Sequence, residues 1–150
     1  MAPSDELRGH IAGLRRLTDG IRPDQMSNAT PCAKWTVRDL CNHFVGGAQM
    51  FASAFRGDEV AIDPDAPTPD LLGSDPARAF DDAVAAFVSA VDSPGAMDRT
   101  INLPFGQLPA PVTLAIIARP GLRRNVLAPL THAAKAAGTV RQQRGFMACL

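Results

Sequence analysis

The chain has 150 residues, enough for one domain with its own core, and its 46% hydrophobic and 20% charged residues are ordinary for a soluble globular protein. No apolar run free of charge and proline could cross a bilayer, and the N-terminus MAPSDELRGH lacks the regions of a signal peptide, so we expect a cytoplasmic protein without membrane contact. Cysteines at positions 32, 41 and 149 are an odd number without CxxC spacing, which favours neither a disulfide framework nor a thiolate zinc site.

The net charge is zero, but the charges are unevenly distributed. Residues 1–98 hold all 15 acidic residues and eight Lys or Arg, a net charge of −7. Residues 99–150 hold seven Lys or Arg and no acidic residue. Such a segment indicates either an anion-binding surface or a sequence history that differs from the rest.

Helical spacing of apolar residues predicts a first helix over residues 5–20, followed by a loop rich in Pro, Asn and Ser. A second helix is expected from Val37 to Phe55, with Thr36 and Asp39 as a capping box. Its predicted apolar stripe consists of Val37, Leu40, Cys41, Phe44, Ala48, Phe51, Ala52 and Phe55.

The second half of the chain has weaker patterns. After a Pro- and Asp-rich loop over 57–74, a third helix is expected with Ser74 or Asp75 as its cap, and it should end before Pro94. Residues 98–111 predict a short extended excursion with a turn at 105–106, and 112–118 form an apolar segment. A last helix over 125–137 is plausible from its alanine content, although Pro129 lies near its middle.

The stretch TPCAKWTVRDLCNHFVGG, residues 30–47, holds the candidate functional residues. Trp35 precedes the second helix and is expected to pack on its first turn as a hydrophobic staple. Cys41 lies in the apolar stripe, where a thiol acts as a small hydrophobe. His43 lies about 120 degrees from the centre of that stripe, at the border of the core.

His43 is the one candidate for chemistry in this stretch. Gly46 and Gly47 follow within the same helix, where each glycine costs about 0.8–1 kcal/mol relative to alanine, and room beside the imidazole would be one reason for them. A single imidazole cannot hold a divalent metal, so a solvated or hydrogen-bonded histidine is the competing interpretation. A metal site would need two or three further ligands from other helices.

Residues 30–57 resemble the mycothiol-dependent maleylpyruvate isomerase N-terminal-domain family, within the DinB/YfiT-like metalloenzymes of actinobacteria. The family pattern there is close to TPCxxWxVRxLxNHxxGGxxxF. This chain carries in it Thr30, Pro31, Cys32, Trp35, Val37, Arg38, Leu40, Asn42, His43, Gly46, Gly47 and Phe51. The segment INLPFGQLPA at 101–110 also resembles the family's segment before its last helix.

The resemblance implies an all-α, DinB/YfiT-like four-helix bundle with a divalent metal, zinc or nickel, at one end. It makes His43 the first ligand, with an acidic residue and a histidine four residues apart on the last helix as the others. His132 is the histidine available there, but Ala128, four positions before it, cannot coordinate. We therefore expect a bundle domain over 1–118 with an irregular or incomplete last helix, and a divergent basic tail over 119–150 that a shifted reading frame would explain.

Two functions from different classes follow. In the first, the chain is a metal-binding bundle related to mycothiol-dependent isomerases and transferases, acting on a small-molecule substrate or low-molecular-weight thiol, with catalysis impaired by the lost ligands. In the second, it is a non-catalytic module whose basic tail binds an anionic partner; nucleic acid is disfavoured because no aromatic residue interleaves the arginines before Phe146. An incomplete bundle would leave apolar faces uncovered, which favours a homodimer.

Overall fold

A computed structural model describes residues 2–31, 34–60, 67, 69–104 and 106–118 of the chain. Within these residues the fold is mostly helical with one small antiparallel sheet, the class expected from the sequence except for the sheet. The elements are α1 (Asp5–Asp19), the 3-10 helix η1 (Pro23–Gln25), α2 (Val37–Arg56), α3 (Pro76–Val91), the 3-10 helix η2 (Ala96–Asp98), β1 (Thr100–Leu103), β2 (Gly106–Pro109) and α4 (Ala110–Ile117).

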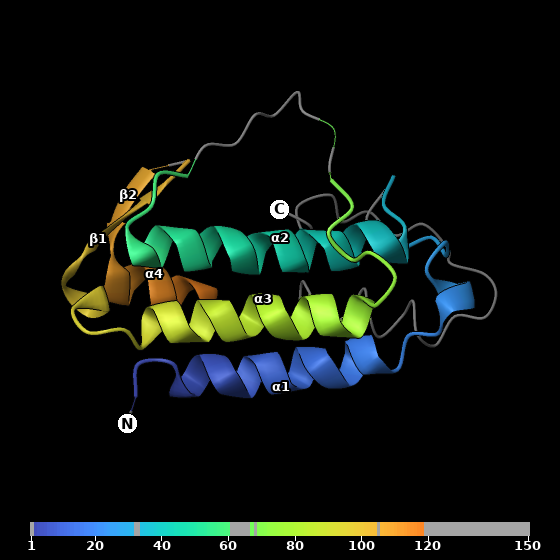
Figure 1. Cartoon of the computed structure of the whole chain (residues 1–150), viewed down its shortest axis with the longest axis horizontal. Helices are drawn as coiled ribbons and strands as arrows, with labels where there is room; N and C mark the ends of the chain where they lie inside the picture. Colours follow the sequence, from blue (N-terminus) through green and yellow to red (C-terminus); the bar gives the residue numbers. More distant parts are fainter. Residues whose placement is uncertain (1, 32–33, 61–66, 68, 105, 119–150) are drawn as a thin grey trace.

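Three long helices lie side by side, and the hairpin and α4 gather at one end of them (Figure 1). The helix α3 packs against both α2 and α1. The colours of Figure 1 show that α2 and α3 run in the same direction and α1 in the opposite one. The end of α2 and the start of α3 therefore lie at opposite ends of the bundle.

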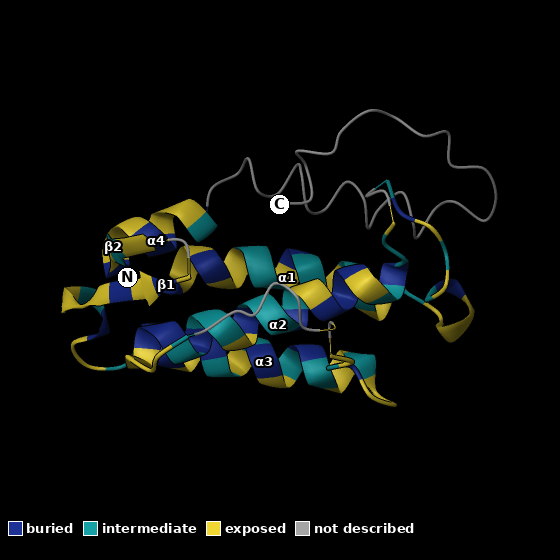
Figure 2. Ribbon diagram, turned by 90° about the horizontal axis from the view of Figure 1, so that it is seen from above, coloured by how far each residue is buried: buried dark blue, intermediate teal, exposed yellow. Residues whose placement is uncertain are grey.

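The core is formed by buried residues of the three long helices together with residues of β1 and α4, and Figure 2 shows where buried residues lie along these elements. Phe87 of α3 is its aromatic centre, with ring centroids 5.6 Å from Phe51 and 5.8 Å from Phe55. The buried side of α2 differs from the predicted stripe, because it includes Asn42 and Val45, whereas Phe44 and Phe51 are only partly buried. A buried asparagine has to be hydrogen-bonded, and Asn42 has its partners in Asp70 and Leu71.

Helix ends follow the predicted capping signals. Asp75 caps α3 by accepting a hydrogen bond from the Arg78 N–H at 3.1 Å, so Asp75 rather than Ser74 is the cap. Ser4 is fully buried before α1, and its hydroxyl donates to Asp92 at the end of α3 over 2.6 Å. The hydrogen bond to Ser4 is the main cause that lowers the pKa of Asp92. This contact ties the first and third helices together.

The segment after α3 confirms the expected extended excursion. The strands β1 and β2 pair antiparallel with Thr100 opposite Pro109 and Leu103 opposite Gly106, and residue 105 of the predicted turn lies outside the described residues. The apolar segment expected at 112–118 is helical and begins earlier, at Ala110. No helix in the described part of the chain is long and apolar enough to cross a membrane.

Candidate functional site

The loop before α2 closes onto the start of that helix. Thr30 donates both its N–H and its hydroxyl to the Trp35 carbonyl, at 3.1 and 2.9 Å. The first three N–H groups of α2 donate to the carbonyl oxygens of Asn28 and Met26 and to the Thr36 hydroxyl. Because these donors already have acceptors within the chain, this helix start is not an open anion site.

The predicted capping box is confirmed. Thr36 accepts from the Asp39 N–H at 3.2 Å, and its own N–H and hydroxyl donate to Asp39 Oδ2 at 2.8 and 2.7 Å. Hydrogen bonds from Thr36 lower the pKa of Asp39, and the bond from the Thr36 backbone N–H has the largest effect. Asp39 lies one turn before His43, but its carboxylate is hydrogen-bonded in the capping box at the start of α2.

His43 is exposed on α2, but aromatic rings flank it. Its ring centroid lies 5.0 Å from that of Trp35 and 6.1 Å from that of Phe44. Desolvation lowers the pKa of His43 below its ordinary value. The neighbouring rings therefore shield the imidazole from water on part of its surface, although the residue as a whole is exposed. The result is an imidazole that is neutral at pH 7 and accessible, the form in which histidine binds a metal. Trp35 thus faces His43, a contact that the predicted staple on the first turn did not include.

A neighbouring set of residues holds the connection to α3. We call Arg38, Asn42 and Gly46 the loop-facing row, since they lie four residues apart on α2 and all meet the segment 70–73. Asn42 is buried: its side-chain oxygen accepts from the Leu71 N–H at 2.8 Å, and its side-chain nitrogen donates to the Asp70 carboxylate at 3.3 Å.

Arg38 completes this contact. Its guanidinium donates to the Asp70 carboxylate at 2.6 Å and to the Gly73 carbonyl at 3.2 Å. The hydrogen bond from Arg38 is the largest of the causes that lower the pKa of Asp70. Arg38 and Asn42, two residues of the resemblance pattern, therefore hold residues 70–73 against α2 by hydrogen bonds.

The two glycines have different surroundings. A Cβ added at Gly46 would lie 3.3 Å from Leu71 Cδ1, whereas one at Gly47 would meet no atom within 4 Å outside the helix and its neighbours. Gly46 therefore makes room for the 70–73 segment rather than for the imidazole, which corrects that part of the expectation. Gly47, one turn after His43, does leave open space. We call Asp39, His43 and Gly47 the outer row.

Cys41 is buried in the core, as predicted. Desolvation raises the pKa of its thiol to about 11, against a smaller opposing effect of Arg38. At neutral pH this thiol is protonated and a poor nucleophile or metal ligand.

The described residues do not assemble a complete metal centre around His43. No group of three or more His, Cys, Asp or Glu side chains in the described part of the chain could hold a metal ion. His132, the second predicted ligand, lies outside the described residues, as do the predicted helix at 125–137 and the basic tail 119–150. Within the described ranges His43 is thus a single imidazole, fewer than the three or four ligands that a metal site needs.

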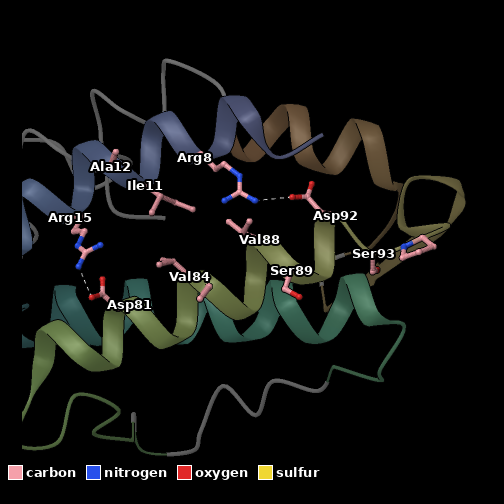
Figure 3. A pocket seen from close by; sticks show the side chains of 12 residues that line it. Arg8, Ile11, Ala12, Arg15, Asp81, Val84, Val88, Ser89, Asp92 and Ser93 are labelled. Atoms are coloured by element: carbon pink, nitrogen blue, oxygen red, sulfur yellow. Dashed lines mark hydrogen bonds and ion pairs between the residues drawn. The ribbon is translucent and has the colours of Figure 1, made fainter. Parts of the chain in front are cut away.

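A groove lies between α1 and α3 (Figure 3). Ion pairs cross it near its ends, Arg8 to Asp92 at 3.0 Å and Arg15 to Asp81 at 2.8 Å. Its apolar lining includes Ile11, Val84 and Val88. No histidine or cysteine lines it, and its charged groups are already paired, so we interpret it as the packing seam of two helices.

Sequence reasoning missed the loop-facing row. The signal was present, because Arg38 and Asn42 are polar residues four apart within a helix, and Asn42 stands beside apolar Cys41. The partner segment, however, is about thirty residues away and carries no pattern of its own, so only the fold reveals the contact.

Comparison with known proteins identifies the family of the chain. The family model described as mycothiol maleylpyruvate isomerase N-terminal domain matches residues 7–119. Two uncharacterized proteins of Mycobacterium tuberculosis, from strains CDC 1551 / Oshkosh and H37Rv, are each 36% identical to the chain over 117 residues. That match covers 78% of this chain and 56% of each relative, so the chain spans about half the length of the curated relatives it matches. No solved structure matches the chain. By the extent of the family match, the chain belongs to the mycothiol maleylpyruvate isomerase N-terminal domain family.

Proposed function

We propose that the chain is a metal-binding helical bundle domain that acts with a low-molecular-weight thiol, mycothiol, on a small-molecule substrate. The observation that carries the proposal is His43, a neutral and accessible imidazole on α2, in a chain of a mycothiol-related family. In this proposal, residues 1–118 form the bundle domain and 119–150 a separate basic tail.

The side chains around His43 suit the role of a single ligand. Trp35 and Phe44 flank the ring and restrict its orientation, and the open space at Gly47 leaves one side free for a bound group. A divalent ion, zinc or nickel, would lower the pKa of a thiol that coordinates it. Cys41 would not compete with such a thiol, because it is buried and protonated.

The remaining ligands must come from outside the described residues, and we propose His132 as one of them. With His43 and His132 as its protein ligands, the site would bind the metal weakly by the standard of complete three- or four-ligand sites. Catalysis of isomerisation or group transfer would be impaired for the same reason.

Metal titration of the full chain, purified without a histidine tag, tests this proposal. We expect calorimetry to show that Zn²⁺ or Ni²⁺ binds the wild type. His43→Ala should weaken binding at least about tenfold, because substitutions around a metal site reduce metal affinity by that order. His132→Ala should also weaken binding, whereas His10→Ala, on α1, is the matched control and should not. Absence of binding by the wild type, or equal binding by His43→Ala, would refute the proposal.

A further inference from the structure

The turn that carries Trp35 contains a strained residue. Lys34 has a φ of 72°, and of the residues that the structure describes it is the one non-glycine with positive φ. Lysine rarely adopts this left-handed conformation, because its Cβ then crowds the backbone. Lys34 is exposed, and none of the ion pairs among the described residues involves it. Such strain persists only where the surrounding backbone is held by other contacts.

Contacts on both sides of Lys34 hold this turn. Thr30, which is buried, donates its N–H and its hydroxyl to the Trp35 carbonyl at 3.1 and 2.9 Å. Ala29 and Thr36 pair next to them as an isolated antiparallel bridge. The chain therefore reverses direction between Thr30 and Trp35, and a residue with positive φ permits so short a reversal.

The turn, rather than helix α2, sets the direction of the Trp35 side chain. Trp35 precedes Val37, the first residue of α2, by two positions. Its carbonyl is held by Thr30, and its partly buried ring packs against the core. The ring centroid lies 5.0 Å from that of His43, with 53° between the two ring planes. Aromatic pairs of this kind have a preferred geometry, so a change in the turn would move the indole off the imidazole.

We propose that Thr30 and Lys34 are positioning residues for His43, and that they act through Trp35. The strained turn directs the indole ring against the imidazole and thereby fixes the orientation in which the imidazole meets a metal. Loss of a group that orients a ligand histidine typically weakens metal binding by about tenfold or more. For this consequence the inference rests on the proposed function, whereas the contact between the two rings does not depend on a metal.

Two substitutions of Lys34 test the proposal, because both remove the ammonium group and only one is compatible with the turn. Glycine adopts positive φ without penalty, whereas β-branched valine rarely does. In the metal-free protein, NMR should show Overhauser contacts between the Trp35 and His43 rings in the wild type and in Lys34→Gly, and their loss in Lys34→Val. The Zn²⁺ affinity of the full chain should stay near the wild-type value in Lys34→Gly and fall at least about tenfold in Lys34→Val.

A second pair of variants serves if circular dichroism shows that Lys34→Val does not fold. Thr30→Val removes the hydroxyl that donates to the Trp35 carbonyl, and Thr30→Ser keeps it. We expect Thr30→Val to weaken both the ring contact and the Zn²⁺ affinity, and Thr30→Ser to preserve both. In a Trp35→Ala background, neither valine variant should reduce the affinity further, because the effect passes through the indole ring.

Three results would overturn the proposal. The first is a ring contact that persists in Lys34→Val or, where that variant does not fold, in Thr30→Val. The second is a Lys34→Gly protein that loses as much as Lys34→Val, and the third is a further loss of affinity from a valine variant in the Trp35→Ala background. A wild type that binds no Zn²⁺ would instead refute the proposed function, and the ring contacts of the variants would still decide whether the turn positions the imidazole.

Discussion

The loop-facing row and the outer row of α2 differ by a shift of one residue, yet their surroundings are opposite. In the loop-facing row, Asn42 is buried and each of its polar groups has a partner. In the outer row, His43 is exposed and Gly47 borders open space. Arg38, Asn42 and Gly46 of the sequence pattern thus meet the 70–73 segment, whereas His43 is exposed and Gly47 has open space beside it.

The largest expected effect is on the loop-facing row. Asn42→Ala removes two hydrogen bonds and leaves the Leu71 N–H without its acceptor, so we expect the free energy of unfolding to fall by about 2–3 kcal/mol. Urea denaturation measures this loss. His43→Ala, one residue away, is the control and should cost less than about 1 kcal/mol. Equal losses for the two variants would contradict the distinction between the rows.

The glycines offer a smaller effect of opposite sign. Gly47→Ala should stabilise the protein by up to about 1 kcal/mol, because it gains helix propensity and its Cβ meets open space. Gly46→Ala gains the same propensity but places its Cβ 3.3 Å from Leu71 Cδ1, so its stabilisation should be smaller or absent. Thermal denaturation of both variants compares them, and a Gly46→Ala protein as stable as Gly47→Ala would speak against a tight fit of Leu71.

The smallest effect is the pH dependence of His43. Its pKa in the folded state lies below the unfolded value, so as the pH falls below about 6.5 the unfolded chain takes up a proton first. The stability that the neutral ring contributes is therefore present at pH 7 and lost as the pH falls through the folded pKa. Proton NMR should show His43 titrating below about pH 6.5, and Trp35→Ala should move its pKa upward. A midpoint that Trp35→Ala leaves unchanged would exclude Trp35 as a source of the desolvation.

Local sequence signals predicted most of the described fold. The three long helices, the capping box of Thr36 and Asp39, the Asp75 cap and the extended excursion before α4 all depend on residues close together in the chain. The burial of Asn42 and the role of Gly46 could not be predicted, because they depend on where a distant loop returns across α2. His43 was identified as a candidate at the border of the core from its angle on the helix, and the structure exposes it. Its aromatic neighbours became clear only from the fold.

Stability and Zn²⁺ affinity, measured together on Asn42→Ala and His43→Ala, test most directly whether the two rows of α2 have different roles. Asn42→Ala, studied at a temperature where it is folded, should lose stability by about 2–3 kcal/mol and keep its affinity within about a factor of three. His43→Ala should keep its stability and lose at least about tenfold in affinity. A His43→Ala protein that binds Zn²⁺ as the wild type does, while Asn42→Ala loses the affinity, would contradict the assignment of the two rows.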